Sequence, residues 1–240
     1  MKTKIFAILT AILLFGAAAS PAYADLDIYE DTDIYGGSYW FINIYDTPPD
    51  HTTVNIYDVN SDYITTYDES TLNFFGGSAQ IGANNNSIVN ITGGNLNGAD
   101  AYNYGTVNFY DGAISTSLGA YDHGISNVYG GTIDHIGVVG SGEVNIYSGL
   151  IIDSLSAYES SILNLHAYNF YYDPTGGDYD GGKITGNWIL DDVYFDISLY
   201  GSETFLHINV VPEPTMFVLF GIGSLMLFRK NNSKNNVKYS

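Results

Sequence analysis

The sequence has no cysteine and very few basic residues. The absence of cysteine excludes a disulfide framework, a Cys-ligated metal site and a cysteine nucleophile. Only 7 of the 240 residues are Lys or Arg, and six of these lie in two clusters at the ends of the chain. Between the clusters there are one basic residue, Lys183, and all 26 acidic residues, so residues 25–228 carry a net charge of −25. A body with so few cations cannot neutralise phosphates, which excludes nucleic acid as a partner.

The first 24 residues have the three parts of a secretory signal peptide. Lys2 and Lys4 form a positive start, a short uncharged apolar run follows, and Ala22 and Ala24 supply the small residues of a cleavage site. An uncleaved membrane anchor is the alternative, but the apolar run is short and the cleavage site follows it at once. We therefore predict a signal peptide over residues 1–24, removal by signal peptidase, and an exported mature chain.

The C-terminus combines a short motif, an apolar segment and a basic tail. In order, these are Pro212, Glu213 and Pro214, then an apolar segment that begins at Met216 and ends at Phe228, then Arg229 and Lys230. A stop-transfer segment has this order, with the basic residues held on the cytoplasmic side. The apolar segment spans only about 20 Å as a helix, against a hydrocarbon core of about 30 Å. A segment of this length is more typical of a transient membrane association than of a permanent anchor.

This order of parts resembles the PEP-CTERM sorting signal of Gram-negative bacteria. The resemblance covers residues 211–240, and it departs from the family in the long Asn-containing tail that follows Lys230. It implies recognition by an exosortase-like sorting enzyme, transient contact with the inner membrane, and a final location in the cell envelope or outside the cell. Cargo proteins of that family tend to accompany exopolysaccharide and biofilm production, so exopolysaccharide is an expected partner.

Residues 51–170 contain a repeat of about 18 residues. Its mark is an asparagine between two apolar residues, as in Val144-Asn145-Ile146. Consecutive asparagines of this kind are 17 to 19 residues apart: Asn55, Asn73, Asn90, Asn108, Asn127, Asn145 and Asn164. A glycine follows four residues after the asparagine in five of the repeats: Gly77, Gly94, Gly112, Gly131 and Gly149. A constant spacing of equivalent residues indicates a repeat architecture.

The residues of each repeat predict short strands. β-Branched and aromatic residues alternate with polar ones around each asparagine, and glycines separate the runs. One coil cannot bury its apolar face, whereas stacked coils bury a continuous one. We therefore predict an all-β fold, a β-solenoid of about seven coils and about 30 Å in length, followed by a single apolar helix. An antiparallel β-sandwich is the alternative, but it does not require a constant spacing.

Segments on either side of the repeat break its period. Open ends of a solenoid would polymerise unless they were covered. We therefore expect residues 25–50 to cap the first end of the rod and residues 171–210, which contain alternating strand-like stretches, to cap the last.

Alternation places the residues of each coil on two faces. Val144 and Ile146 are predicted to point inward, and Asn145 and Tyr147 outward. Stacking then predicts an outer column of asparagines and a second outer column: Tyr57, Phe75, Thr92, Tyr110, Tyr129, Tyr147 and His166. A partial third column consists of Tyr102, Tyr121 and Tyr158. Exposed rings can bind sugars, but we favour a stabilising role, because cross-strand aromatic pairs stabilise sheets without a ligand.

Few residues are candidates for catalysis or metal binding. The loop that contains Asp173, Asp178 and Asp180 offers carboxylates to a Ca²⁺ ion. It lacks the spacing and the closing Glu of an EF-hand, so we favour a solvated loop. The adjacent acids Asp191 and Asp192 are weak candidates for a glycosidase pair, and the five histidines show no metal or triad spacing. We predict no catalytic residues and no resident cofactor.

Taken together, these features lead to two functional hypotheses. The first is an exported, non-enzymatic β-solenoid that serves as a component of the cell surface or of an extracellular, biofilm-associated matrix. The alternative is a carbohydrate-binding or polysaccharide-degrading β-helix protein. A flat aromatic strip beside a concave acidic pair would favour the alternative, and a uniform surface would favour the first.

Overall fold

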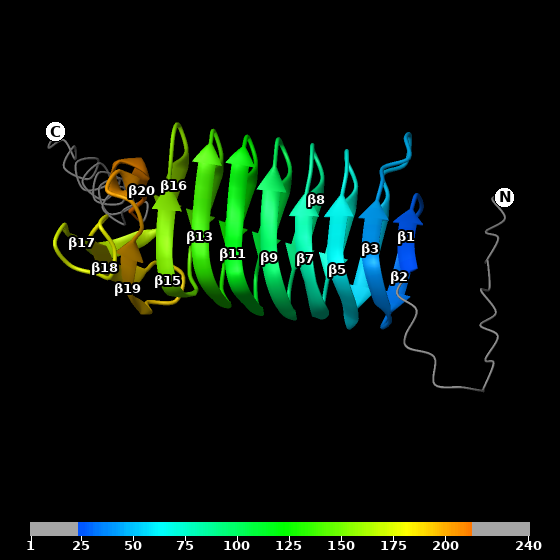
Figure 1. Ribbon diagram of the computed structural model, residues 1–240, viewed down its shortest axis with the longest axis horizontal. Helices are drawn as coiled ribbons and strands as arrows, with labels where there is room; N and C mark the ends of the chain where they lie inside the picture. The colour runs from blue at the N-terminus through cyan, green and yellow to red at the C-terminus, as the bar shows by residue number, and fades with distance from the viewer. Residues whose placement is uncertain (1–23, 213–240) are drawn as a thin grey trace, which may run out of the picture.

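The structure, a computed structural model, describes residues 24–212 and has two sheets, parallel in the coils, wound into a rod (Figure 1). The nine-stranded sheet holds the short strands. In spatial order they are β2 (Thr32–Tyr35), β4 (Thr53–Tyr57), β6 (Thr71–Phe74), β8 (Ile88–Ile91), β10 (Thr106–Phe109), β12 (Ile125–Val128), β14 (Glu143–Ile146), β16 (Ile162–Leu165) and β20 (Ile208–Val210).

The eleven-stranded sheet holds the long strands of the same coils. In spatial order they are β1 (Ala24–Ile28), β3 (Ser38–Ile44), β5 (Val59–Thr66), β7 (Gly77–Ala83), β9 (Asn95–Tyr102), β11 (Ala113–Asp122), β13 (Thr132–Gly140), β15 (Leu150–Ala157), β19 (Tyr194–Leu199), β18 (Lys183–Trp188) and β17 (Ala167–Asp173). The β-solenoid prediction, with coils of about 18 residues, is confirmed, and the rod has about eight turns.

The register of the strands follows the sequence repeat. From β4 to β16 each motif asparagine pairs with the asparagine of the next coil, in parallel, as Asn108 does with Asn90 and Asn127. The same parallel pairing excludes the antiparallel sandwich, in which neighbouring strands run in opposite directions.

The core lies between the two sheets and consists of the inward columns. Val144 and Ile146 are fully buried, as predicted, and their equivalents in the other coils are buried with them. Ser126 occupies a position that holds Val in both neighbouring coils. Its hydroxyl donates a hydrogen bond of 2.7 Å to the Gly119 carbonyl oxygen, so this buried polar group is satisfied.

The two ends of the rod are built differently. Residues 25–50, for which we expected a cap, carry β1, β2 and β3, which extend both sheets by parallel pairing with the coils that follow. The connection between β3 and β4 is longer than in later coils, which hides the period in the sequence. At the other end, β17, β18 and β19 form an antiparallel meander on the last coil, and the 3₁₀ turn Thr204–His207 leads into β20.

Both terminal sorting predictions fall on residues that the structure leaves undescribed. Apart from Ala24 and Pro212, the predicted signal peptide and the segment from Glu213 through Lys230 lie outside the described residues. They remain predictions from the sequence. Within residues 24–212, no helix has the length and apolar character needed to cross a membrane.

Candidate functional site

The asparagine column on the nine-stranded sheet is a continuous chain of side-chain hydrogen bonds. Each Nδ2 donates to the Oδ1 of the preceding coil, with distances of 2.9 to 3.0 Å from Asn73 to Asn164. The chain extends beyond the predicted repeat: Asn55 donates to the Asp33 carboxylate at 2.8 Å, and Asn209 donates to Asn164 at 3.2 Å. All the amide dipoles therefore point the same way, with a carboxylate at the positive end.

Aromatic rings form a second column beside the asparagines. The predicted column is present and begins one coil earlier, at Tyr35, whose ring centroid lies 4.8 Å from that of Tyr57. It is interrupted at Thr92 and continues through Tyr110 and Tyr129 at 4.9 Å. A separate stack, not predicted, joins Tyr29, Tyr45 and Tyr67 with spacings of 5.1 and 5.0 Å.

The partial tyrosine column on the other sheet is shorter than predicted. Tyr102 and Tyr121 stack with their centroids 5.0 Å apart. Val139 occupies the next coil, opposite Tyr121, so Tyr158 is separated from the pair. The aromatic column beside the asparagines and the Tyr102–Tyr121 pair thus both join neighbouring coils. Cross-strand aromatic pairs of this kind stabilise a sheet.

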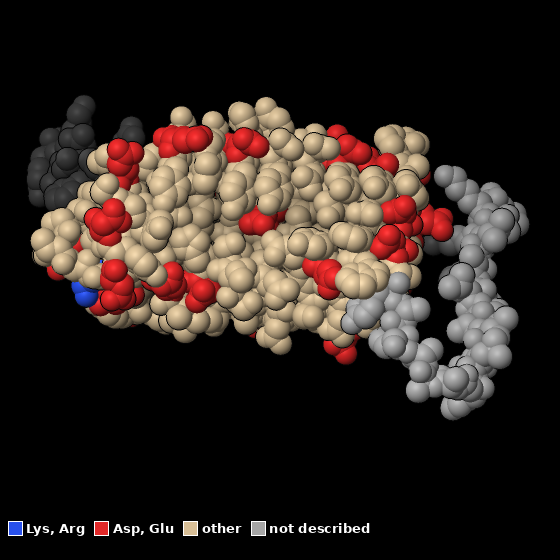
Figure 2. All heavy atoms as spheres, in the orientation of Figure 1, with Lys and Arg blue, Asp and Glu red and all other residues tan. Residues whose placement is uncertain are grey.

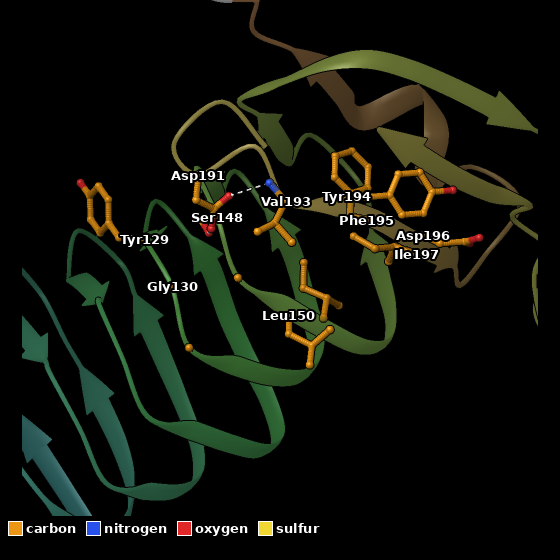
Figure 3. A pocket seen from close by; sticks show the side chains of 13 residues that line it. Tyr129, Gly130, Ser148, Leu150, Asp191, Val193, Tyr194, Phe195, Asp196 and Ile197 are labelled. Atoms are coloured by element: carbon orange, nitrogen blue, oxygen red, sulfur yellow. Dashed lines mark hydrogen bonds between the residues drawn. The ribbon is translucent and has the colours of Figure 1, made fainter. Parts of the chain in front are cut away.

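A groove of about 360 Å³ lies where the C-terminal meander meets the coils (Figure 3). Its floor is made by glycines at the coil corners, and its rim by exposed Leu150, Val193 and Tyr194. Tyr129, from the aromatic column, lies at one end of the groove, and Phe195 also lines it. A concave site with aromatic and aliphatic walls and a few polar groups is the common form of a small-ligand site.

Asp191, which lines this groove, and its sequence neighbour Asp192 already have partners. Asp191 accepts hydrogen bonds from the Ser148 hydroxyl and from the Val193 backbone N–H. Asp192 accepts from the Tyr168 hydroxyl. The two carboxylates named as a weak glycosidase pair therefore have separate partners: Asp191 joins its own turn to Ser148, and Asp192 joins that turn to Tyr168 on β17.

Asp100 is a buried carboxyl on the outer face of the eleven-stranded sheet that the sequence analysis missed. Only 6% of the residue is exposed, and a hollow of about 140 Å³ lies beside it. One oxygen accepts from Gln80 at 3.0 Å and from the Tyr102 hydroxyl at 3.2 Å, whereas Oδ1 has no hydrogen-bond partner among the described residues. Burial raises the pKa of the Asp100 carboxyl, and the bonds from Tyr102 and Gln80 oppose part of that rise.

Asp100→Asn is expected to stabilise the protein at neutral pH by an amount on the order of 1 kcal/mol. Asparagine can keep its carbonyl oxygen toward Gln80 and Tyr102 while it removes a buried charge. Because the folded-state pKa of Asp100 is raised, the wild-type protein regains stability as the pH falls through that pKa, and the difference should shrink. Thermal melts from pH 7 downward measure it, with exposed Asp111→Asn as the control. If the Asp100→Asn protein were less stable than the parent at pH 7, the charged carboxylate would be stabilising the fold, contrary to this prediction.

His135 lies between two serines that the sequence does not single out. Its Nδ1 is 2.9 Å from the Ser154 hydroxyl and its Nε2 is 2.9 Å from the Ser156 hydroxyl. Ser154 donates to Asp153, which also accepts from the Tyr179 hydroxyl at 2.6 Å. Burial lowers the pKa of His135, which favours the neutral ring, and the bond from Tyr179 lowers the pKa of Asp153.

This cluster differs from a catalytic triad in its order. In a triad the carboxylate contacts the imidazole directly, whereas here Asp153 hydrogen-bonds to Ser154 rather than to His135. Ser156 is also only 5% exposed, which leaves little access for a substrate. The arrangement ties the loop that carries Tyr179 to the last coils of the rod.

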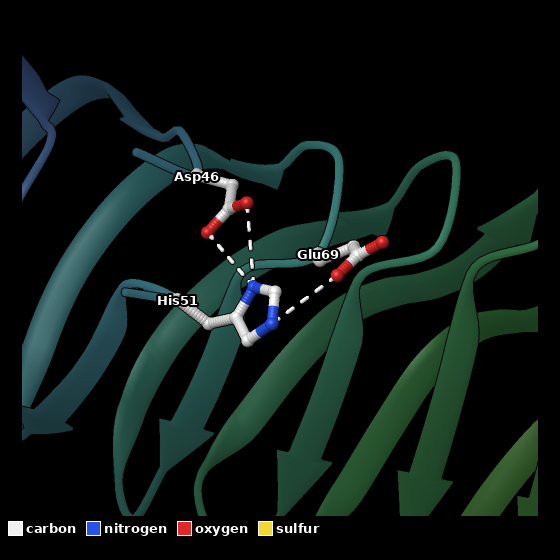
Figure 4. Close-up of side chains that lie close together, drawn as sticks. All are labelled: Asp46, His51 and Glu69. Carbon is white, nitrogen blue, oxygen red and sulfur yellow. Dashed lines mark hydrogen bonds and ion pairs between the residues drawn. The ribbon is translucent and has the colours of Figure 1, made fainter. Parts of the chain in front are cut away.

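One group among the described residues brings three potential metal ligands together (Figure 4). These are Asp46, His51 and Glu69, whose ligand atoms lie within 4.8 Å of one another. Nδ1 of His51 faces Asp46 at 3.4 Å, and Nε2 faces Glu69 at 3.3 Å. Because each ring nitrogen faces a different carboxylate, an ion bound to one nitrogen would leave the other carboxylate on the far side of the ring. The geometry suits a bridging imidazole better than a metal centre.

The loop named as a weak calcium candidate does not gather its carboxylates. Asp173 accepts from the backbone N–H and the hydroxyl of Thr175, and Asp180 accepts from the Gly201 N–H at 3.0 Å. Asp178 uses its backbone N–H to bind the Ser198 hydroxyl. These three acids are not among the groups of described residues that could share an ion, which is consistent with carboxylates that order the loop itself.

Acidic side chains are scattered over the visible face of the rod, and one basic group lies near its C-terminal end (Figure 2). Lys183 is ion-paired with Asp196 at 2.9 Å, and this hydrogen bond raises the pKa of Lys183. Among residues 24–212 it is the sole Lys or Arg, so the other Lys, Arg, Asp and Glu positions in this part of the chain are all acidic.

No family model matches the chain, no curated protein matches it, and no solved structure matches it. The likeness of residues 211–240 to a PEP-CTERM signal therefore rests on the sequence motif alone.

Proposed function

We propose that this protein is an exported, non-enzymatic rod that serves as a component of the cell surface or of an extracellular matrix. The observation that carries the proposal is the unbroken amide column from Asp33 to Asn209, which uses outward side chains to bind one coil to the next. Most of the outer aromatic side chains do the same. Outward side chains that hydrogen-bond and stack between coils stabilise the rod along its length. This use of the outer surface fits a structural protein better than an enzyme.

Export and sorting follow from the two terminal segments of the sequence. Changing Glu213→Ala, or deleting residues 216–240, is expected to alter processing and surface retention while the rod stays folded. The physical reason is that the apolar segment holds the Pro-Glu-Pro motif at the membrane, where a sorting enzyme acts. Cell fractionation and the mass of the recovered protein measure the effect in the native host. Thr215→Ala, next to the motif, is the matched control.

Two outcomes separate sorting from folding. A Glu213→Ala protein with the same mass and location as the parent would contradict the proposed sorting. A variant that is absent from every fraction would instead indicate degradation, and circular dichroism of the same variant produced separately as a recombinant protein can check whether the rod is folded.

Carbohydrate binding is a second candidate function, and the groove of Figure 3 favours it. Tyr194 is 61% exposed at its rim and Leu150 is 61% exposed opposite the meander. Rings and aliphatic side chains of this kind can pack against the apolar faces of sugars, and nearby polar groups can bind hydroxyls. The negative surface favours neutral or amino sugars over acidic ones.

A polysaccharide array with the purified protein discriminates between the two candidates. A binding protein is expected to retain particular neutral or amino glycans, and Tyr194→Ala is expected to weaken that binding at least tenfold. Tyr63→Ala removes a ring of similar exposure far from the groove and is the control. Absence of binding to every glycan leaves the structural rod as the function.

A further inference from the structure

The two ends of the rod have different shapes. At the N-terminal end both sheets stop at the same coil, because β1 is the outer strand of one sheet and β2 of the other. At the C-terminal end the nine-stranded sheet adds only β20 beyond β16, whereas the other sheet adds three strands beyond β15. The first end is therefore flush and the last end is stepped (Figure 1).

The flush end leaves strand edges and ring faces open. Among the described residues, β1 pairs only with β3 and β2 only with β4. An unpaired edge presents a row of N–H and C=O groups that can pair with another strand. Tyr35 and Tyr29, which end the two aromatic stacks here, are 73% and 56% exposed. Each described stack ends with one ring face uncovered at this end.

We propose that the flush ends of two copies of this chain pair with each other. Only another solenoid end offers two edge strands at the separation of the two sheets, so it continues the contact that already joins coil to coil. The stepped C-terminal end cannot meet β1 and β2 together. A twofold axis that runs through both sheets brings β1 against β1 and β2 against β2, antiparallel in each case. Such an interface uses the same surface on both copies and closes at a dimer.

Charge controls this pairing. The first coil carries five carboxylates within residues 25–33: Asp25, Asp27, Glu30, Asp31 and Asp33. Acidic side chains gather at this end of the rod in Figure 2. Twofold pairing sets the five carboxylates of one copy opposite those of the other, and like charges brought together in this way repel. At neutral pH and low salt the repulsion holds the copies apart.

The surrounding groups add to this control. Asp27 accepts from Asn43, Asp31 from the Thr53 N–H, and Asp33 from Asn55 and the Tyr35 hydroxyl. Asp50 and His51 line a hollow with Glu30 and Asp31, and Asp46 lies next to His51. Lowering the pH toward the isoelectric point of the sequence, about 4.1, brings the net charge of the chain toward zero, so the repulsion between two such ends falls. Added salt screens the same repulsion.

Sedimentation velocity on the full chain tests the proposal. The chain is expressed with both terminal segments and purified after export, and mass spectrometry defines its ends. We expect monomers at pH 7 and a doubling of mass, without larger species, as the pH is lowered toward 4. The variant Asp27→Asn, Asp31→Asn, Asp33→Asn keeps one acceptor oxygen at each position and is expected to pair at pH 7, with a dissociation constant at least tenfold below that of the parent.

Two matched variants make the test specific. Asp111→Asn, Asp178→Asn, Glu203→Gln removes the same charge far from β1 and β2, and we expect it to stay monomeric at pH 7. Adding Thr32→Glu to the first variant returns a negative charge to β2 of each copy, beside the remaining Asp25 and Glu30, and is expected to restore monomers. Equal pairing by the distant variant, open-ended polymers, or monomers under all conditions would each overturn the proposal. Melting curves confirm that each variant is folded, and the inference stands apart from the proposed function because it concerns only the rod.

Discussion

Ile146→Asp is expected to unfold the coils around it and to lower the free energy of unfolding by at least about 4 kcal/mol. Ile146 is fully buried and pairs with Val128 in the preceding coil and Leu165 in the next. An aspartate there would carry its charge into the space between the two sheets, where no cation faces it. A loss of this size is a large share of the stability of an ordinary domain.

Tyr147→Ser, one residue further on, is the matched control. It removes an outward ring that stacks between Tyr129 and His166 at centroid distances of 4.9 and 3.9 Å, at a cost of about 1 kcal/mol. Urea titrations followed by circular dichroism and tyrosine fluorescence measure both variants. Repeat arrays can unfold locally, so the two probes are compared before a single free energy is assigned. Comparable losses for the two variants would mean that the two faces are not energetically distinct.

The period and the alternation were sufficient to predict the central coils. Asn55 through Asn164 lie in one column because each is about 18 residues from the next, and strand alternation then puts Val144 and Ile146 inside. The residues at the two ends of this column could not be predicted from the period. Asp33 and Asn209 occupy the same column but are 22 and 45 residues from their neighbours in it, because a long connection and a meander intervene.

Contacts on the outer face of the long strands were harder to predict. The pairing of β11 with β9 shifts register between Ile114 and Ser117, so simple alternation fails along these strands. That irregularity places Asp100 against Gly119, where a side chain would be too close to the carboxylate. The contact of His135 with Ser154 could have been found from the 18-residue period, because the two residues are 19 positions apart.

The groove of Figure 3 depends on tertiary structure rather than on the repeat. One wall comes from the coil corners near Gly149, and the other comes from Val193 and Tyr194 in a segment without any period. Trp188 fixes this segment, because its ring is buried, stacks on Phe195 and donates to the Gly149 carbonyl oxygen at 3.0 Å. No pattern in the sequence indicates which coil the tryptophan meets.

Gly77→Ala is expected to destabilise the rod by at least about 3 kcal/mol, whereas Gly76→Ala is expected to be nearly neutral. Gly77 has a φ of +110°, and a Cβ built there would lie 1.9 Å from the Val59 carbonyl oxygen. Both the backbone conformation and the approach of the preceding coil therefore exclude a side chain. At Gly76 the nearest atom to such a Cβ is the Asp58 nitrogen at 3.8 Å, which is an ordinary contact.

The adjacent pair isolates the native-state effect. Each variant removes one glycine from the same turn, so both change the entropy of the unfolded chain by the same amount. The difference between their free energies of unfolding then reports only the conformation and the close packing at Gly77. Urea titrations of both proteins under identical conditions give that difference. If the two variants were equally stable, the turn between β6 and β7 would have to rebuild without cost, and the glycine column that recurs in the following coils would not be required by coil stacking.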